Sequence, residues 1–390
     1  MKKLIFCLGT RPEAIKMAPL ILEAQKRKQE VKVLVTGQHK EMLLPFLKFF
    51  NLKVDFNLDV LKPNQSLPEL TATILRQVSP ILQAEKPDLV FVQGDTTTTM
   101  ASALAAFYEK IPLVHIEAGL RTFDRYSPFP EEMNRKLVGS IAEYHFPPTK
   151  ESEQNLFREG ITKNVSVTGN TGVDALRITL ERLGKDSSTI KPFSEGKKQV
   201  LMTCHRRENH GKPLESICSA LLEVVDNNRH VNVVFPVHLN PNVQNMVHYK
   251  LGNHERIRLI DPQGYQEFSE LMFESDLILT DSGGVQEEAP YLKKPIFVLR
   301  ESTERSEGVS AGVAMLVGSD HQKIVSTLER ALYNREFYES FQKAVNPYGD
   351  GYSSQRILDH LGVTHTEYVP ETVTSFASIF EAQFGNESLL

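Results

Sequence analysis

The feature that most constrains this chain is a regular alternation of short apolar segments with longer helical ones. In the first half, the segments expected to form strands are Leu4–Leu8, Val31–Thr36, Asp88–Gln93 and Ile111–Ile116. Helical patterns cover Pro12–Gln29 and Thr99–Glu109. This alternation predicts βαβ units, in which buried parallel strands are covered by helices on both faces.

The same alternation starts again after the middle of the chain. The strands expected there are Lys198–Thr203, Val231–Val237, Arg256–Ile260, Asp276–Thr280 and Pro295–Leu299. The expected helices are Leu214–Asn227, Tyr265–Glu274 and Gly284–Leu292. A chain of 390 residues is also too long for one ordinary hydrophobic core.

We therefore predict two doubly wound α/β domains, one formed by residues 1–170 and the other by residues 171–360. Residues 361–390 are expected to join the first domain. The stretch 184–196 is rich in Ser, Lys and Gly and is expected to be a loop near the junction. Ligands of open α/β sheets bind beyond the carboxyl ends of the strands, so the site is expected in the cleft between the domains.

Composition excludes several classes of protein. The net charge is −5, from 44 basic and 49 acidic residues, which argues against a nucleic-acid partner. Three cysteines argue against a disulfide scaffold, and no apolar run is long enough for a signal peptide or a membrane span, so we expect a cytoplasmic protein. An anionic ligand would need a local cluster of positive groups.

Several cofactor and metal motifs are absent from the sequence. It has no G-x-G-x-x-G after a strand, no Walker A motif, no H-E-x-x-H, no paired C-x-x-C and no D-x-D. We therefore expect neither a bound dinucleotide nor a dedicated metal site.

Positive charges follow the first strand. Gly9-Thr10-Arg11-Pro12-Glu13 opens the first helix, and Lys16 lies one turn into it. Cations beside a helix N-terminus suit an anion. A generic helix start with surface charges explains this segment equally well.

Carboxylates follow two consecutive strands. Asp95 lies in the segment QGDTTTT and Glu117 in HIEAGLR. Neighbouring carboxylates that are half-buried drive their pKa values apart, as a general acid and base pair requires. The alternatives are that Asp95 only caps a helix and that Glu117 only pairs with Arg121.

Two further segments could contribute to a site. Glu131 and Glu132 stand at the start of a helix in PFPEEMNR, a place that acidic residues favour for structural reasons alone. His205 and Arg206 follow the first strand of the second half and suit a diphosphate, whereas Cys204 is expected to be a small buried residue.

The strongest single signal is a strand that runs into Ser282-Gly283-Gly284 and then a helix. Bare backbone amides at a helix start suit a phosphate, although a plain tight turn would look similar. Glu288, one turn into the helix, could accept hydrogen bonds from ribose hydroxyls. Arg305 adds another cation after the next strand.

Taken together, these motifs make the chain resemble the bacterial non-hydrolysing UDP-N-acetylglucosamine 2-epimerases. The segments that carry the resemblance are GTRPEAIKMAPL, GQHKEML, GDTTTT, HIEAGLRT, YSPFPEEMNR, CHRREN, PVHLNPNV, LTDSGGVQEEAP and NPYGDG. The resemblance implies a GT-B fold, which consists of two Rossmann-like domains with the active site in the cleft between them. It also implies a homodimer and a role in supplying N-acetylmannosamine units to surface polysaccharide.

The resemblance also implies roles for individual residues. The residues that match catalytic positions are Asp95, Glu117, Glu131 and His205. Those expected around the substrate and its UDP moiety are Arg11, Lys16, His205, Phe268, Ser282, Gly283, Gly284, Glu288 and Arg305, with Phe268 near the uracil. Those that match a second, allosteric UDP-N-acetylglucosamine site are Gln38, His39, Met42, Gln65, Glu132 and Arg206. Departures at Lys40, Asn64, Ser306 and Val313 weaken the expectation of allostery more than that of catalysis.

The reaction implied by the resemblance is the reversible interconversion of UDP-N-acetylglucosamine and UDP-N-acetylmannosamine. The C2–H bond is not next to a carbonyl and no nicotinamide motif is present, so elimination of UDP to a 2-acetamidoglucal followed by re-addition is favoured. The alternatives are a hydrolysing epimerase that releases N-acetylmannosamine and UDP, a GT-B glycosyltransferase and a nucleotide-sugar sensor without activity.

Overall fold

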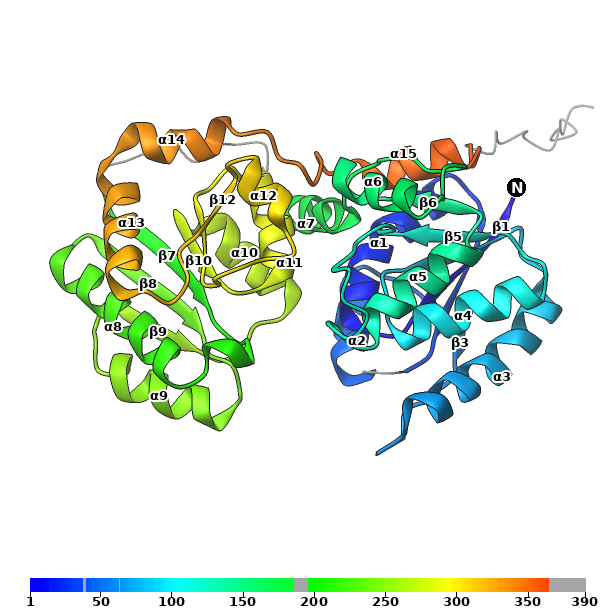
Figure 1. Cartoon of the computed structure of the whole chain (residues 1–390), viewed down its shortest axis with the longest axis horizontal. Coiled ribbons are helices and arrows are strands. Elements are labelled where there is room, and N and C mark those ends of the chain that lie inside the picture. Colours follow the sequence, from blue (N-terminus) through cyan, green and yellow to red (C-terminus); the bar gives the residue numbers. More distant parts are fainter. Residues whose placement is uncertain (38–39, 63, 186–195, 365–390) are drawn as a thin grey trace, which may run out of the picture.

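Two parallel six-stranded sheets organise the protein (Figure 1). The structure is a computed structural model, and it describes residues 1–37, 40–62, 64–185 and 196–364. The strand orders are β3-β2-β1-β4-β5-β6 and β12-β11-β10-β7-β8-β9. When the second sheet's strands are counted from β7, its order is the same as the first, read from the other end. In both sheets the strand order therefore changes direction beside the first strand, between β1 and β4 in one and between β7 and β10 in the other.

The elements of the first sheet and its helices follow one another along residues 3–182. The strands are β1 (Lys3–Leu8), β2 (Glu30–Val35), β3 (Phe56–Asn57), β4 (Leu89–Gln93), β5 (Leu113–Ile116) and β6 (Tyr144–Phe146). The helices are α1 (Arg11–Lys26), α2 (Lys40–Phe49), α3 (Leu67–Glu85), α4 (Thr97–Tyr108), α5 (Glu131–Ile141), α6 (Lys150–Arg158) and α7 (Thr171–Arg182).

The second sheet is built by residues 198–316. Its strands are β7 (Lys198–Thr203), β8 (Val231–Pro236), β9 (Ile257–Ile260), β10 (Leu277–Thr280), β11 (Ile296–Val298) and β12 (Ala314–Leu316). Its α-helices are α8 (Lys212–Asn227), α9 (Pro241–Leu251), α10 (Tyr265–Glu274), α11 (Gly283–Glu288), α12 (Ser306–Ser310), α13 (His321–Tyr333) and α14 (Arg335–Lys343). Short 3₁₀ turns lie at Arg207–Asn209 and Ala289–Leu292, and the last helix described is α15 (Ser353–His360).

The expected strands are confirmed to within two residues at each end. The central strand β1 shows why these strands could be predicted from the sequence. Its residues Leu4 to Leu8 are at most 1% exposed. Strands covered on both faces have nearly continuous apolar sequences. The expected helix at Gly284–Leu292 is in fact α11 followed by a 3₁₀ turn, because Pro290 has no N–H to continue the helical hydrogen bonding. The expected loop at 184–196 lies mostly outside the described residues.

The three short strands β3, β6 and β12 have no counterpart among the expected strands. Each has only two or three residues and lies at an edge of its sheet. Periodicity cannot be recognised over so short a segment. The GT-B architecture of two Rossmann-like domains is confirmed.

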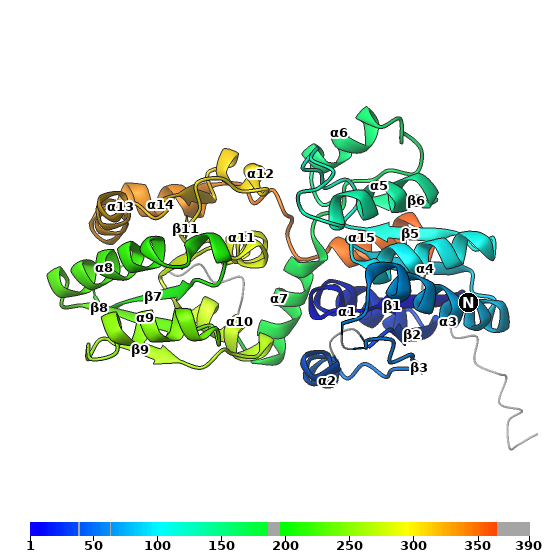
Figure 2. The same ribbon diagram turned by 60° about the horizontal axis from the view of Figure 1, so that its bottom comes forward.

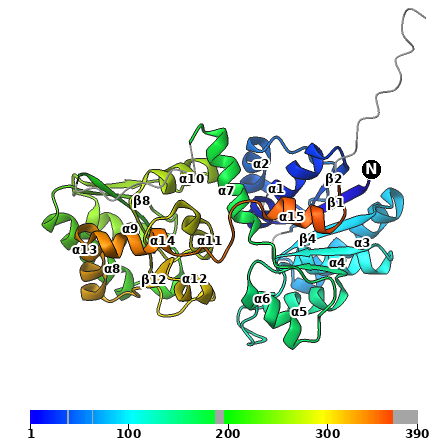
Figure 3. The same ribbon diagram turned by 90° about the horizontal axis from the view of Figure 1, so that it is seen from above.

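The chain crosses between the two sheets twice, and the crossings lie side by side (Figures 1 and 3). The Asn170 amide donates to the Tyr348 carbonyl at 2.7 Å. At Gly169 an added Cβ would lie 3.4 Å from the Cα of Gly349, and both glycines have positive φ, at 95° and 110°. Close contact and left-handed backbone together favour glycine at this hinge.

The second crossing leads into α15, which packs on α1 in the first sheet's domain (Figure 2). Arg27, directly after α1, donates hydrogen bonds to Asp359 at 2.6 Å and to the Val363 carbonyl at 2.7 Å. The chain therefore returns to the first domain at residue 353, eight residues before the start of the segment expected to do so. The domain boundaries at 170 and 360 remain predictions.

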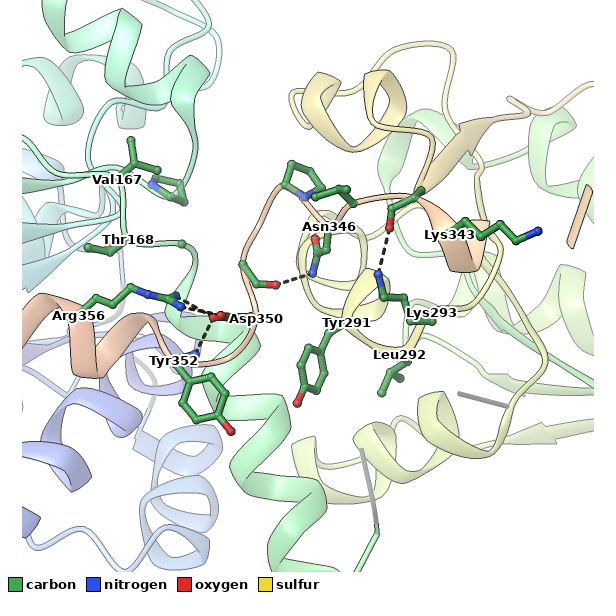
Figure 4. A pocket seen from close by; sticks show the side chains of 16 residues that line it. Val167, Thr168, Tyr291, Leu292, Lys293, Lys343, Asn346, Asp350, Tyr352 and Arg356 are labelled. Atoms are coloured by element: carbon green, nitrogen blue, oxygen red, sulfur yellow. Dashed lines mark hydrogen bonds and ion pairs between the residues drawn. The ribbon is translucent and has the colours of Figure 1, made fainter. Parts of the chain in front are cut away.

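A cavity of about 760 Å³ lies beside the two crossings (Figure 4). Val167 and Thr168 line it from the first crossing, Asn346 and Asp350 from the second. Two of the charged residues that line it pair with each other, because Arg356 forms two hydrogen bonds with Asp350, at 2.6 and 2.7 Å. Within the part of the chain that is described, no helix has both the length and the apolar character needed to cross a membrane.

Candidate active site

The candidate site is formed where the two strand-order reversals face each other. Four strands contribute their carboxyl ends: β1 and β4 in the first domain, β7 and β10 in the second. The segments that follow these strands carry Arg11, Asp95, His205 and Ser282. Such reversals are where open α/β sheets bind ligands, so the fold alone brings these predicted residues to one region.

A cavity of about 440 Å³ lies at the first-domain side of this region. Four cations line it, namely Arg11, Lys16, Arg135 and Arg305. Three carboxylates line it as well, namely Glu13, Asp95 and Glu117. The cavity is thus the local cluster of positive groups that an anionic ligand would require, and it has carboxylates beside it.

Glu13 is structural rather than reactive. It is 2% exposed, and its side chain accepts from the Gly9 amide at 2.8 Å and from the hydroxyls of Thr96 and Thr99 at 2.6 and 2.9 Å. It therefore ties the turn after β1 to the turn after β4. Burial raises its pKa, although these hydrogen bonds oppose the effect.

Glu117 extends into the cavity from the end of β5. Its backbone has φ of 61°, a left-handed conformation that costs a non-glycine residue about 1–2 kcal/mol and that gathers at functional sites. Its carboxylate contacts Lys16 and Gln93. Burial raises the pKa of Glu117, and Lys16 only partly offsets this.

The alternative role for Glu117, an ion pair with Arg121, is wrong. Arg121 pairs with Glu159 at 2.6 Å instead of Glu117. The alternative for Asp95 is also wrong, because Thr96 caps α4 by accepting from the Thr99 amide at 3.2 Å.

Asp95 is held by α5. Its carboxylate accepts from Arg135 Nε at 2.8 Å and lies 2.7 Å from Nη2 of the same guanidinium, while its carbonyl accepts from Asn134 at 2.8 Å. Arg135 was not singled out in the sequence, although it ends the YSPFPEEMNR segment. Its position one turn after Glu131 is the signal that could have found it.

Glu131 and Glu132 differ in role although they are adjacent. Glu132 is fully buried, accepts from the amides of Thr122 and Phe123 at 3.0 and 3.2 Å, and pairs with Arg135 at 3.2 Å. It therefore holds the loop before α5. One oxygen of Glu131 is buried without a hydrogen-bond partner, on the same face of α5 as Arg135, although Glu131 does not line the 440 Å³ cavity.

Glu287 is a site residue that the sequence analysis missed. It is 3% exposed, and its carboxylate lies 2.9 Å from Lys16 Nζ, 2.9 Å from two nitrogens of Arg305 and 3.0 Å from the Asn170 side-chain nitrogen. Burial opposes its ionisation, but Lys16 and Arg305 outweigh this and hold the pKa of Glu287 at about 2. Its spacing of four residues from Gly283, on the same face of α11, is the sequence signal.

A second cavity, of about 200 Å³, lies at the ends of β7 and β10. His205, Phe268 and Ser282, three of the residues expected around the substrate, all line it. His205 is anchored by the buried carboxylate of Asp281, whose Oδ1 lies 2.9 Å from its Nδ1. Cys204 is 3% exposed and burial raises the pKa of its thiol, in agreement with its expected role as a buried small residue.

Gly283 links the two cavities. An added Cβ there would lie 3.0 Å from Cζ of Arg305, so the guanidinium packs flat on bare backbone. Gly284 follows it with open space beside its Cα, where the nearest atom to an added Cβ is the Ser282 hydroxyl at 4.0 Å. The start of α11 thus presents exposed backbone at Gly284 next to the cation of Arg305, an arrangement that suits a phosphate.

Glu288 is buried, whereas a residue that contacts the ribose of a bound nucleotide is expected to be accessible from the cleft. It is 8% exposed and accepts from the Tyr265 hydroxyl at 3.1 Å. Burial raises the pKa of Glu288 to about 8, and the neighbouring charge of Glu287 adds to this effect. Tyr265 in turn packs edge-on against Phe46 of the first domain, with ring centroids 5.5 Å apart.

Only some of the residues expected at an allosteric site belong to the part of the chain that the structure describes. Gln38 and His39 lie outside the described residues, as does the side chain of Met42. Gln65 accepts from the Lys62 amide at 3.2 Å, and Arg206 donates to the Asp281 carbonyl at 3.1 Å. Among the residues that the structure describes, no group of three or more His, Cys, Asp or Glu could hold a metal ion.

Comparison with known proteins gives one consistent family. A family model described as UDP-N-acetylglucosamine 2-epimerase matches residues 22–362. A protein of that name from Salmonella typhimurium is 50% identical over 368 residues, which cover 92% of this chain and 98% of the relative.

Solved structures agree in sequence and in shape. The UDP-GlcNAc 2-epimerase from Neisseria meningitidis, bound to UDP-GlcNAc, is 47% identical with a TM-score of 0.81, over 92% of this chain and 99% of that one. The Methanocaldococcus jannaschii UDP-GlcNAc 2-epimerase, in complex with UDP-GlcNAc and UDP, is 37% identical with a TM-score of 0.73, over the same shares of the two chains.

Proposed function

The chain belongs to the UDP-N-acetylglucosamine 2-epimerase family, and we propose that the cleft described above inverts carbon 2 of UDP-N-acetylglucosamine. The protein is an isomerase of the non-hydrolysing kind. One observation supports this reading most: two carboxylates, Asp95 and Glu117, line a cavity that four cations share. The reaction needs a carboxylate that transfers a proton, a second that stabilises positive charge at C1, and cations that receive the leaving diphosphate.

The proposed reaction proceeds by elimination and re-addition. A carboxylate removes the C2 proton, the electron pair forms the C1–C2 double bond, and the C1–O bond breaks with its electrons passing to UDP. The 2-acetamidoglucal is then protonated at C2 on the opposite face, and a UDP oxygen re-forms the bond to C1. Atoms and charge balance without a redox cofactor.

Two faces of C2 require two proton-transfer groups. We assign these to Asp95 and Glu131, because the unpartnered Glu131 oxygen shares a face of α5 with Arg135, which holds Asp95. Glu117 is held in the cavity by its contact with Lys16, and in its ionised form it would stabilise the positive charge that develops at C1.

The diphosphate is assigned to the start of α11 and the cations around it. Gly283 and Gly284 would offer amides and Ser282 its hydroxyl, while Arg305 and His205 would meet the charge that grows as the C1–O bond breaks. Arg11 and Lys16 would complete the positive lining, Phe268 would lie near the uracil, and Glu288 would accept from the ribose. The residues around the allosteric position stay a prediction.

The experiment that tests the function is incubation with UDP-N-acetylglucosamine in deuterium oxide, followed by NMR. We expect a reversible mixture of two UDP-sugars with solvent deuterium at C2. Free N-acetylmannosamine with UDP would indicate a hydrolysing enzyme, transfer to an added acceptor would indicate a glycosyltransferase, and unchanged substrate would indicate a sensor.

A homodimer in the cytoplasm is part of the proposal. Phe107, Tyr108 and Leu137 are 54%, 60% and 50% exposed, and the first two line an apolar groove of about 510 Å³ with Ile111. Exposed apolar patches mark protein interfaces. Phe107→Glu should shift the protein toward monomer in sedimentation, and an unchanged distribution would place the interface elsewhere.

A further inference from the structure

Asp281 is a buried carboxylate that joins the ends of β7 and β10. It is 0% exposed. Its Oδ2 accepts from the backbone amides of His205 at 2.9 Å and Arg206 at 2.8 Å, and from the Asn209 side chain at 3.0 Å. These three donors fix the loop that follows β7.

The other oxygen of Asp281 faces the ring of His205. Oδ1 lies 2.9 Å from His205 Nδ1, while the side chain of His205 is 44% exposed and lines the 200 Å³ cavity. Because Nδ1 faces the carboxylate, Nε2 is the ring nitrogen left for a ligand.

The charge of Asp281 decides which nitrogen carries the proton. Burial alone would raise the pKa of Asp281, but His205 and the two backbone amides outweigh it and hold the pKa at about 2. An ionised carboxylate can only accept hydrogen bonds, so its 2.9 Å contact with Nδ1 is favourable when that nitrogen carries the proton.

We propose that Asp281 is a positioning residue, which holds the His205 imidazole with protonated Nδ1 inward and Nε2 toward the diphosphate. The inference rests on the proposed function, which places His205 at the leaving group. As the C1–O bond breaks, the growing charge on the UDP oxygen receives a hydrogen bond from Nε2 of the imidazolium, and Asp281 stabilises that imidazolium.

The competing explanation is that Asp281 only braces the loop through Oδ2. Asp281→Asn separates the two roles. Its amide oxygen can keep the three donors at the Oδ2 position, and its NH₂ then faces Nδ1. Nδ1 must in that case lose its proton, which moves to Nε2, so the variant keeps the brace and reverses the tautomer.

Asp276→Asn is the matched control. Asp276 lies directly before the first residue of β10 and is 1% exposed. Like Asp281, it accepts a hydrogen bond from a backbone amide of the β7 side, here that of Gln199 at 2.7 Å. With activities normalised to the amount of folded protein, Asp281→Asn should lower kcat/KM about 10- to 100-fold, mostly in kcat. Losing the hydrogen-bond partner that orients a metal-binding histidine has an effect of this size. Asp276→Asn should leave kcat/KM within a factor of about two.

A second background removes the histidine. In His205→Gln, adding Asp281→Asn should cause no further loss of kcat/KM, because the ring through which Asp281 acts is gone. An equal fold-loss with and without His205 would overturn the proposal and leave Asp281 as a brace.

The wild-type enzyme gives a test that needs no Asp281 variant. In ¹⁵N NMR, the ring signals that disappear in His205→Gln should show a protonated Nδ1, and a neutral ring protonated only at Nε2 would overturn the proposal. Failure of the wild type to form UDP-N-acetylmannosamine would refute the proposed function instead, and the NMR result would still decide the pairing.

Discussion

Lys16 Nζ on α1 lies 2.9 Å from Glu287 Oε2 on α11, and this buried ion pair connects the two domains beside the candidate site. Glu287 also holds Arg305, so a single carboxylate keeps two cations facing one cavity. Without it, the two positive charges would repel one another at the place where a diphosphate is expected.

The first prediction concerns this connection. Glu287→Gln should lower the free energy of unfolding by about 2–4 kcal/mol, because it leaves a buried Lys16 with only one carboxylate partner. Urea denaturation at pH 7 measures this. Glu304→Gln is the control, since Glu304 also pairs with Arg305, at 2.6 Å, but its side chain is 36% exposed. The control should lower the free energy of unfolding by less than about 1 kcal/mol. If both variants lose the same amount, the interdomain ion pair contributes no more to stability than an exposed one.

The second prediction tests the assignment of the proton-transfer groups. Asp95→Asn and Glu131→Gln should each reduce turnover by about two to four orders of magnitude while UDP still binds, because only proton transfer is removed. Calorimetry with UDP and NMR of the sugar products measure the two properties. Glu159→Gln removes a carboxylate that pairs with Arg121 outside the cavity, and it should keep wild-type turnover. Near-normal turnover of either site variant contradicts the assignment.

The third prediction is a dependence of stability on pH that arises from Glu288. Its pKa is about 8 in the folded protein and its ordinary value is 4.5, so the folded state binds an extra proton between these values. The stabilisation is fully present below about pH 4.5 and is lost as the pH rises through 8. At about 1.4 kcal/mol per pH unit it amounts to several kcal/mol at most.

Glu288→Gln removes this titration. Urea denaturation at pH 6 and pH 9 should therefore show wild type losing stability relative to Glu288→Gln. Glu339→Gln, a change at a surface carboxylate of α14 that pairs with Arg335, should run parallel to wild type. A loss of stability in wild type no larger than that in Glu288→Gln would place the pKa of Glu288 near its ordinary value.

The fourth prediction concerns Gly283. In Gly283→Ala the new methyl would lie 3.0 Å from Cζ of Arg305, and the guanidinium would have to shift from its place on α11 by a few tenths of an ångström. UDP affinity should fall about 10-fold or more, with a stability change below about 1 kcal/mol, because the displaced group is the end of a long side chain. Gly196→Ala, where an added Cβ meets no atom within 4 Å, should bind UDP as wild type does.

The sequence by itself determined the two sheets and the segments that form the site. Strands such as Leu4–Leu8 are buried on both faces, so their apolar runs are visible in the sequence. Asp95 and Glu117 follow strands of the first sheet, and His205 and Ser282 follow strands of the second. They were expected near one cleft because ligands of open α/β sheets bind beyond the carboxyl ends of the strands.

Only the tertiary structure decided which charges meet. Glu117 pairs with Lys16 rather than Arg121, and Glu287 was not predicted at all, because ion pairs between residues 100 or more positions apart depend on how the domains and helices pack. The protonation of Glu288 and the anchoring of His205 by Asp281 are of the same kind. Burial and partners set the charge of a side chain, and neither is written in the residue type or its spacing.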